Sequence, residues 1–194
     1  MTAVNALWRS LAWPGKEHLY LARTDSGWIA DGLVMASPTQ EPFRFHYRIE
    51  LDADWNFKHL WTHQPFLDIA ENRLPDCELI REEDGSWRAE GFEALPDLEG
   101  CIDIDIAITP FTNTLPIRRL ALEPGQSAEI DVAYLSVPEL QLSRTRQRYT
   151  RIAETIEEFD YYLFESLDGS GFAAEISVDL DGLVVDYPDL FTRL

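Results

Sequence analysis

Two aspartates in one short alternating segment are the first residues whose types and spacing suggest chemistry. Asp103 and Asp105 are separated by one residue, so both point to the same side of an extended chain. Two neighbouring carboxylates can share a divalent ion, or serve as acid and base when their pKa values separate. A metal-assisted hydrolase is therefore one hypothesis. No histidine, cysteine or glycine-rich phosphate loop accompanies the pair, so the alternative is a structural strand whose aspartates face water or pair with arginine.

A second segment combines aromatic rings with histidines. Trp55, Phe57, His59, Trp61 and His63 alternate and are expected to share one face of a strand. Such a face can line a site for an acyl chain or stack on a sugar ring, but it can also be plain core packing. The two histidines would lie about 13 Å apart along a strand, too far for one metal ion, so no metal site and no cofactor is expected.

Two adjacent arginines, Arg118 and Arg119, fall in the one segment that favours a helix. A helix enclosed by a sheet excludes charge unless the charge is paired or reaches solvent. The arginines therefore either pair with internal carboxylates such as Asp103 or Asp105, or present a cation to the anionic head of a ligand. Structural pairing is the favoured interpretation.

One basic cluster stands in this acidic chain, and an acidic segment follows it. The cluster could bind a phosphate or a sugar acid, but antiparallel pairing of the two segments would cancel their charges, and this is favoured. A polar strand of this kind also suits a sheet edge or a dimer contact. The basic residues are Arg144, Arg146, Arg148 and Arg151, and the acidic ones are Glu154, Glu157, Glu158 and Asp160.

The segment 100–122 supplies the elements that position the aspartates and arginines. Isoleucines at every second residue from Ile102 to Ile108 predict a half-buried strand, which Pro110 ends. Residues 112–114 offer side-chain oxygens that can cap a helix over about 115–122. A helix this short needs packing against a larger structure.

The rest of the chain predicts many strands separated by turns. The predicted strands span 17–24, 28–36, 43–51, 55–63, 77–83, 86–91, 128–137, 140–152, 159–167, 172–180 and 183–187. Near-helical spacing of apolar residues in 151–166 is the main competing signal, and the β-prone run there favours a strand. Gly32 is expected to mark a bend. A long sheet curled around one helix is the predicted fold, mainly β.

Length and charge limit the function. The 194 residues suit one domain over 1–194, and a net charge of −19 disfavours binding to nucleic acid. No apolar run is long enough for a transmembrane helix, and no export signal is visible, so a cytoplasmic location is expected. Cys77 and Cys101 are expected to be buried thiols rather than a disulfide framework.

Residues 98–105 and 109–120 resemble the signature of a bacterial family of glycolipid-binding proteins. Weaker matches cover the hairpin at 47–55, the turn at 84–87 and the segment 178–188. The resemblance implies a spiral β-roll, a long antiparallel sheet wound around one short central helix at about 115–122. It also implies a homodimer and a lipid or glycolipid ligand.

The leading hypothesis is a non-enzymatic protein that holds an amphipathic lipid or glycolipid in or beside the β-roll. The alternatives are the Asp103/Asp105 hydrolase and a dimeric interaction scaffold without a small ligand. The residues expected to bind the ligand are Arg118, Arg119, Trp55, Phe57, Trp61 and His59.

Overall fold

The computed structural model describes residues 3–39, 41–63, 77–89, 94–152 and 156–194. These residues form fourteen strands of one sheet. The strands are β1 (Ala3–Ser10), β2 (Gly15–Thr24), β3 (Gly27–Ala36), β4 (Phe43–Leu51), β5 (Phe57–His63), β6 (Glu78–Arg81), β7 (Trp87–Ala89), β8 (Asp103–Ile106), β9 (Ser127–Leu135), β10 (Leu142–Arg151), β11 (Asp160–Ser166), β12 (Ala173–Val178), β13 (Val184–Tyr187) and β14 (Phe191–Arg193). Three short helices complete the described part: η3 (Pro96–Leu98), η4 (Phe111–Asn113) and α1 (Thr114–Leu120).

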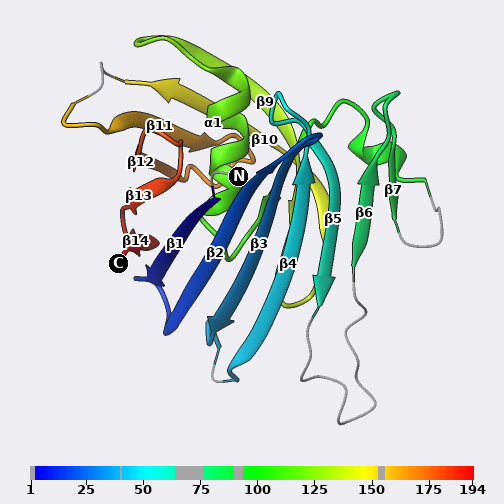
Figure 1. Cartoon of the computed structure of the whole chain (residues 1–194), viewed down its shortest axis with the longest axis horizontal. Helices are drawn as coiled ribbons and strands as arrows, with labels where there is room; N and C mark the ends of the chain where they lie inside the picture. Colours follow the sequence, from blue (N-terminus) through cyan, green and yellow to red (C-terminus); the bar gives the residue numbers. More distant parts are fainter. Residues whose placement is uncertain (1–2, 40, 64–76, 90–93, 153–155) are drawn as a thin grey trace.

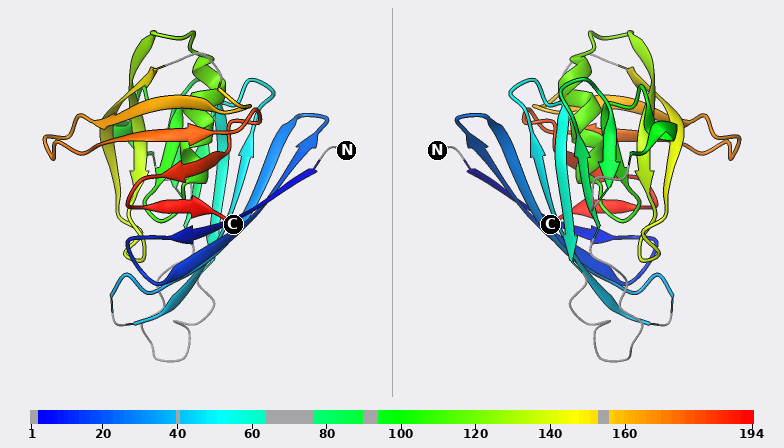
Figure 2. Two further views of the ribbon diagram at one scale, coloured as in Figure 1. Left: turned by 90° about the vertical axis from the view of Figure 1, so that its left-hand side faces the viewer. Right: turned by 90° about the vertical axis from the view of Figure 1, so that its right-hand side faces the viewer.

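The sheet has two halves, β1 to β7 and β8 to β14, which join where the first strand, β1, pairs with the last, β14. Its order runs from β7 back to β1, continues with β14, and then runs back from β13 to β8. β1 and β14 pair directly, with Trp8 opposite Arg193. The sheet curls around α1, which lies between the first five strands and β9 to β13 (Figures 1 and 2). Because β7 and β8 stand at the two ends of the order, the sheet is a long open roll, as predicted.

Two details of the sheet differ from the sequence prediction. β8 pairs with β9 in parallel, with Asp103 opposite Val132, whereas the other described pairs are antiparallel as expected. β10, whose polar character suits a sheet edge or a dimer contact, lies inside the sheet between β9 and β11. Its arginines are satisfied by neighbouring strands: Arg144 and Arg146 reach Asp131 on β9, and Arg148 reaches Glu129 and Glu165. Charge cancellation was correctly predicted. Of the acidic segment expected to supply it, Glu154 lies outside the described residues, and among the described ones Asp160 pairs with Arg151.

The central helix is confirmed, with a different start. η4 leads directly into α1, and Leu115 and Ile117 on α1 are buried. The cap prediction at 112–114 is wrong, because no side chain there caps α1. Instead, Thr109 Oγ1 accepts a hydrogen bond of 3.0 Å from the Phe111 amide at the start of η4. The helix ends at Leu120. The next residue, Ala121, caps it with a left-handed backbone (φ 44°), and its amide donates a hydrogen bond to the Ile117 carbonyl.

Segment 100–108 has buried residues on both sides of the strand rather than on one. Cys101, Ile104 and Ile106 are each at most 1% exposed, and so is Asp103. Burial on both sides arises because residues of β8 pack into the core of the first sheet half, and β8 also contacts α1 and η4. For Asp103 the prediction that it faces water is therefore wrong, and the alternative of pairing with arginine applies. Asp105 is partly exposed and accepts hydrogen bonds from Gln147 and Thr112 instead.

A buried acid lies where β2, β4 and the start of η4 meet. Glu17 is 2% exposed, and its Oε1 accepts hydrogen bonds from the hydroxyls of Tyr47 (2.5 Å) and Thr109 (2.7 Å). Burial raises the pKa of the Glu17 carboxyl from 4.5 to about 7, against the lowering effect of these two hydrogen bonds. Folding therefore favours the protonated acid.

This acid predicts a pH dependence of stability. Between the unfolded pKa of 4.5 and the folded value of about 7, the folded chain keeps a proton that the unfolded chain has lost, so the free energy of unfolding falls as pH rises. The total loss is about 3 kcal/mol. Glu17→Gln should remove it, and urea unfolding at about pH 5 and about pH 8 measures the difference. Equal pH slopes for the wild type and the variant would contradict the assignment, since all other titrating groups are common to both.

Candidate functional site

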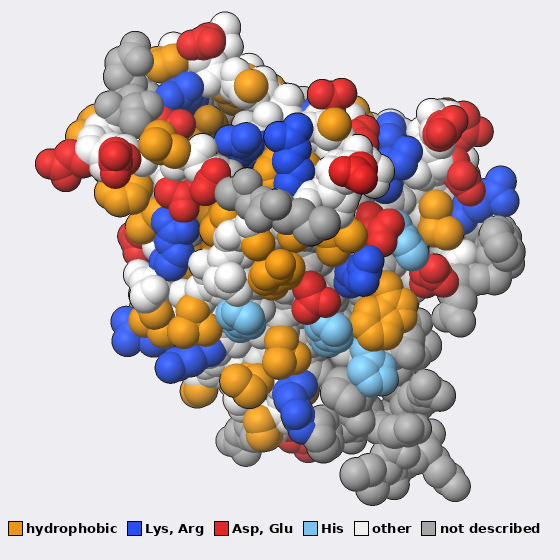
Figure 3. All heavy atoms as spheres, viewed as in Figure 1, with side chains coloured by type: hydrophobic (Ala, Val, Ile, Leu, Met, Phe, Trp, Pro, Cys, Tyr) orange, Lys and Arg blue, Asp and Glu red, His pale blue; other side chains and the backbone are white. Residues whose placement is uncertain are grey.

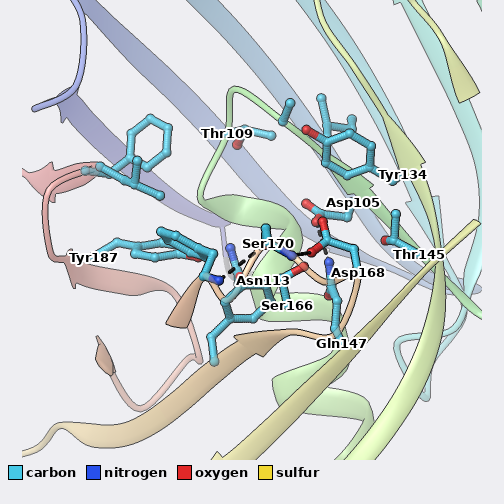
Figure 4. A pocket seen from close by; sticks show the side chains of 16 residues that line it. Asp105, Thr109, Asn113, Tyr134, Thr145, Gln147, Ser166, Asp168, Ser170 and Tyr187 are labelled. Carbon is cyan, nitrogen blue, oxygen red and sulfur yellow. Dashed lines mark hydrogen bonds between the residues drawn. The ribbon is translucent and has the colours of Figure 1, made fainter. Parts of the chain in front are cut away.

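A cavity of about 300 Å³ lies beside the end of η4, where the central helix α1 begins. Its walls come from β8, the loop to η4, the inner faces of β9 to β11, the loop between β11 and β12, and β13 with the turn to β14. Figure 4 shows polar side chains from these elements pointing toward one space. The polar members are Asp105, Thr109, Asn113, Tyr134, Thr145, Gln147, Ser166, Asp168, Ser170 and Tyr187.

Asp105 is the fixed acceptor of this cavity. Its Oδ2 accepts a hydrogen bond of 2.6 Å from Gln147 Nε2, and its Oδ1 accepts one of 3.1 Å from Thr112 Oγ1. Burial raises the pKa of the Asp105 carboxyl above its ordinary value, although the hydrogen bonds from Gln147 and Thr112 act the other way. With both donors in place, the carboxyl is held in one orientation at the cavity wall.

Neighbouring groups orient the side-chain amides of Asn113 and Gln147, which both line the cavity. Asn113 Nδ2 donates to the Pro110 carbonyl, and Asn113 Oδ1 accepts a hydrogen bond of 2.9 Å from the Tyr149 hydroxyl. Tyr149 lies on β10, two residues from Gln147, so both side chains face inward. These contacts, with the hydrogen bond from Gln147 to Asp105, hold both side-chain amides in fixed orientations toward a ligand.

Thr145 contributes a hydroxyl without a partner. Its Oγ1 is buried, lines the cavity and makes no hydrogen bond within the part of the chain that the structure describes. A buried hydroxyl without a hydrogen bond costs free energy. A polar ligand in the cavity would satisfy it.

The opposite wall is aromatic. Phe164 packs on Phe172 (ring centroids 6.0 Å apart) and on Tyr187 (6.2 Å). Tyr187 also packs on Phe191 at 6.5 Å, and all four rings line the cavity. A sugar ring presents hydroxyls at its edge and apolar C–H groups on its faces, so a cavity with one polar and one aromatic wall matches its chemistry.

The paired aspartates do not act together. Asp103 forms a two-point ion pair with Arg119, through Nε to Oδ1 at 3.1 Å and Nη2 to Oδ2 at 2.5 Å. Asp105 instead faces the cavity. Within the described ranges, no group of three or more His, Cys, Asp or Glu side chains is arranged to hold a metal ion.

The two arginines of α1 have separate roles. Arg119 pairs with Asp103, which was the favoured prediction. Arg118 is exposed, donates to the Leu180 carbonyl at 3.1 Å, and lies over the Trp55 ring at 5.3 Å. Arg118 and Trp55 are thus brought together, but neither lines the cavity beside β8.

The aromatic segment does not share one face. Phe57 is fully buried and stacks on Trp87 at 4.8 Å, whereas His59 and Trp61 lie on the outer face of the sheet. The reason is a bulge: Glu50 lies opposite His59 and Leu51 opposite Phe57, so Lys58 is inserted and the alternation shifts by one residue. His59 there contacts Glu78 at 2.8 Å. The predicted common face is wrong, and ligand contacts of these residues stay a prediction.

Apart from Asp105, sequence reasoning missed the residues that form the cavity, although one signal for them was present. Arginine at every second position of β10 places Thr145, Gln147 and Tyr149 on the other face. Two of these three inward residues are polar and line the cavity. Polar residues on the buried face of a long strand are therefore the signal that could have located it.

The fold and site together define a β-roll protein with a cavity large enough for a small ligand, open to solvent at the loop between β11 and β12. A family model described as "Putative glycolipid-binding" matches residues 5–193, and the chain belongs to this family. The crystal structure of a DUF1089 family protein from Pseudomonas aeruginosa is similar, with 39% sequence identity, a TM-score of 0.78 and 92% of each chain covered. A search of curated proteins gave no match. None of the described helices is long and apolar enough to cross a membrane.

Proposed function

We propose that this protein binds a glycolipid without chemical conversion, holding its sugar head group in the cavity beside α1. One observation carries the proposal. The same cavity has a polar wall, with the unpartnered Thr145 hydroxyl and the oriented Asp105 carboxyl, and an aromatic wall. The volume of about 300 Å³ is at the small end of ligand sites, which suits a head group rather than a whole glycolipid. The family description agrees with this class of ligand.

The arrangement of the two acids supports binding rather than hydrolysis. Asp103 is occupied by Arg119, and Asp105 is held by two hydrogen-bond donors. A carboxyl oriented in this way accepts hydrogen bonds from sugar hydroxyls. Release of free sugar from a glycolipid incubated with the protein would contradict the non-enzymatic part of the proposal.

The predicted homodimer is also part of the proposal, and sedimentation equilibrium of the whole chain tests it.

Thr145→Val provides a sharp test of the cavity. The substitution keeps the shape of the side chain and removes the unpartnered hydroxyl, so the fold should be unaffected while sugar affinity falls about tenfold. Calorimetric titration with octyl glucoside, octyl galactoside and octyl mannoside, each as monomers, measures this loss.

The matched control is Thr114→Val. Thr114 Oγ1 is also buried and without a partner among the described residues, but it does not line the cavity, so its loss should leave affinity unchanged. Octyl phosphocholine has the same tail without a sugar and should bind more weakly than the best glycoside. Equal binding of all these amphiphiles, or equal affinity of both threonine variants, would overturn the proposal.

A further inference from the structure

The outer face of β1 to β4 carries a basic row that crosses four neighbouring strands. Arg9 lies opposite Lys16, Lys16 opposite Met35, and Met35 opposite Arg44. All four side chains are exposed. The next row on the same face places Leu7 and Leu33 on either side of His18. We call Leu7, Arg9, Lys16, Leu33, Met35 and Arg44 the docking patch.

The charge of this patch is opposite to that of the chain. The whole chain has 35 acidic against 16 basic residues, but the patch contains three cations and no acid. Arg9 and Lys16 are direct cross-strand neighbours, and neither has an acidic partner in the described part of the chain. Like charges opposite each other destabilise a sheet, so the fold does not explain their placement.

Apolar side chains of the patch are exposed beside the cations. Met35 is 52% exposed, and Leu7 and Leu33 are each 39% exposed. Met35 stands between two surface depressions, one shared with Arg9 and Lys16 and one shared with Phe43 and Arg44. Figure 3 shows the face that contains β1 to β5, where hydrophobic, histidine and basic side chains lie together with some acidic ones.

We propose that this patch docks the protein on an anionic lipid bilayer. Lys and Arg near such a surface attract anionic head groups, and exposed apolar side chains between them enter the boundary of the acyl region. At physiological salt, charges farther than about 8 Å from the bilayer are screened, so the local cations outweigh the net charge of the chain. This inference goes beyond the head-group site, because it needs no sugar.

A second copy of the chain fits the patch less well than a bilayer does. A two-fold contact through this face would bring the Arg9 and Lys16 region of one copy close to the same cations of its partner. An anionic lipid surface instead offers a negative charge to Arg9 and Lys16, which have no acidic partner among the described residues. Charge complementarity therefore favours the bilayer.

Vesicle flotation tests the proposal with the whole chain. The probe is vesicles of equal parts phosphatidylcholine and phosphatidylglycerol, without glycolipid, compared with pure phosphatidylcholine. The wild type should bind the anionic vesicles preferentially, and Arg9→Gln/Lys16→Gln should bind them about 25-fold more weakly, about fivefold for each cation. Met35→Ser should weaken binding as well.

The control is Arg23→Gln/Arg88→Gln, which changes the net charge equally outside the patch and should bind as the wild type does. Equal weakening by both double variants would overturn the proposal, as would wild-type binding that is no stronger on anionic than on neutral vesicles. A loss of dimer in sedimentation for Arg9→Gln/Lys16→Gln, with unchanged vesicle binding, would assign the patch to a second copy instead. Because the vesicles contain no sugar, failure here leaves the cavity proposal standing.

Discussion

Arg119→Met should lower the free energy of unfolding by about 3–5 kcal/mol, because it leaves the Asp103 carboxyl buried without its cation. Asp103 is 1% exposed, and the guanidinium of Arg119 provides both of its side-chain hydrogen bonds within the described residues. Burial already raises the pKa of Asp103, while Arg119 acts to lower it, so the variant should raise that pKa further. Urea unfolding measures the loss of stability.

The double variant Asp103→Leu/Arg119→Met is the matched comparison. It removes both charges, so much of the lost stability should return. Arg119→Lys should be intermediate, because an ammonium keeps the charge without the planar two-point geometry. If the single and double variants were equally unstable, the loss would arise from packing of the arginine stem rather than from the ion pair.

Gly32→Ala should cost about 3 kcal/mol or more. A Cβ at Gly32 would lie 2.1 Å from a ring carbon of Tyr47 and 2.4 Å from its hydroxyl. The ring cannot move freely, because the Tyr47 hydroxyl is bonded to the buried Glu17. The variant therefore combines overpacking with the loss of a buried hydrogen bond. Thermal and urea unfolding both report the effect.

A double-variant cycle separates this contact from a general effect on the strand. Tyr47→Leu removes the ring, so Gly32→Ala should cost much less in that background than in the wild type. Equal costs in the two backgrounds would mean that the strand, and not the ring, requires glycine. β3 pairs regularly with β2 and β4 through Gly32, so no bulge or break in the pairing accompanies the bend expected there.

The sequence predicted what depends on local pattern. The isoleucine alternation, Pro110 and the apolar run after it were enough to predict a strand followed by a helix, and the family signature in the same segment predicted the roll. The first and last strands were missed. β14 has three residues, and in β1 the outward Leu7 hides the alternation of polar and apolar residues.

Features that depend on long-range geometry were not predictable in the same way. The inserted Lys58 reverses the alternation of β5, and no residue type in that segment indicates it. The cavity is built from residues between Asp105 and Phe191, contributed by segments far apart in the chain, so no single motif contains it. The ion pair of Asp103 and Arg119 was predictable as one of two alternatives, because a charge in an enclosed helix needs a partner.

The most direct test of the central claim is a crystal structure of the protein with a bound octyl glycoside. The account predicts sugar density in the cavity, with one ring face against Phe164 and Tyr187 and a sugar hydroxyl within hydrogen-bond distance of Thr145 Oγ1. Density for the octyl tail in this cavity, with the sugar bound elsewhere or in solvent, would contradict it.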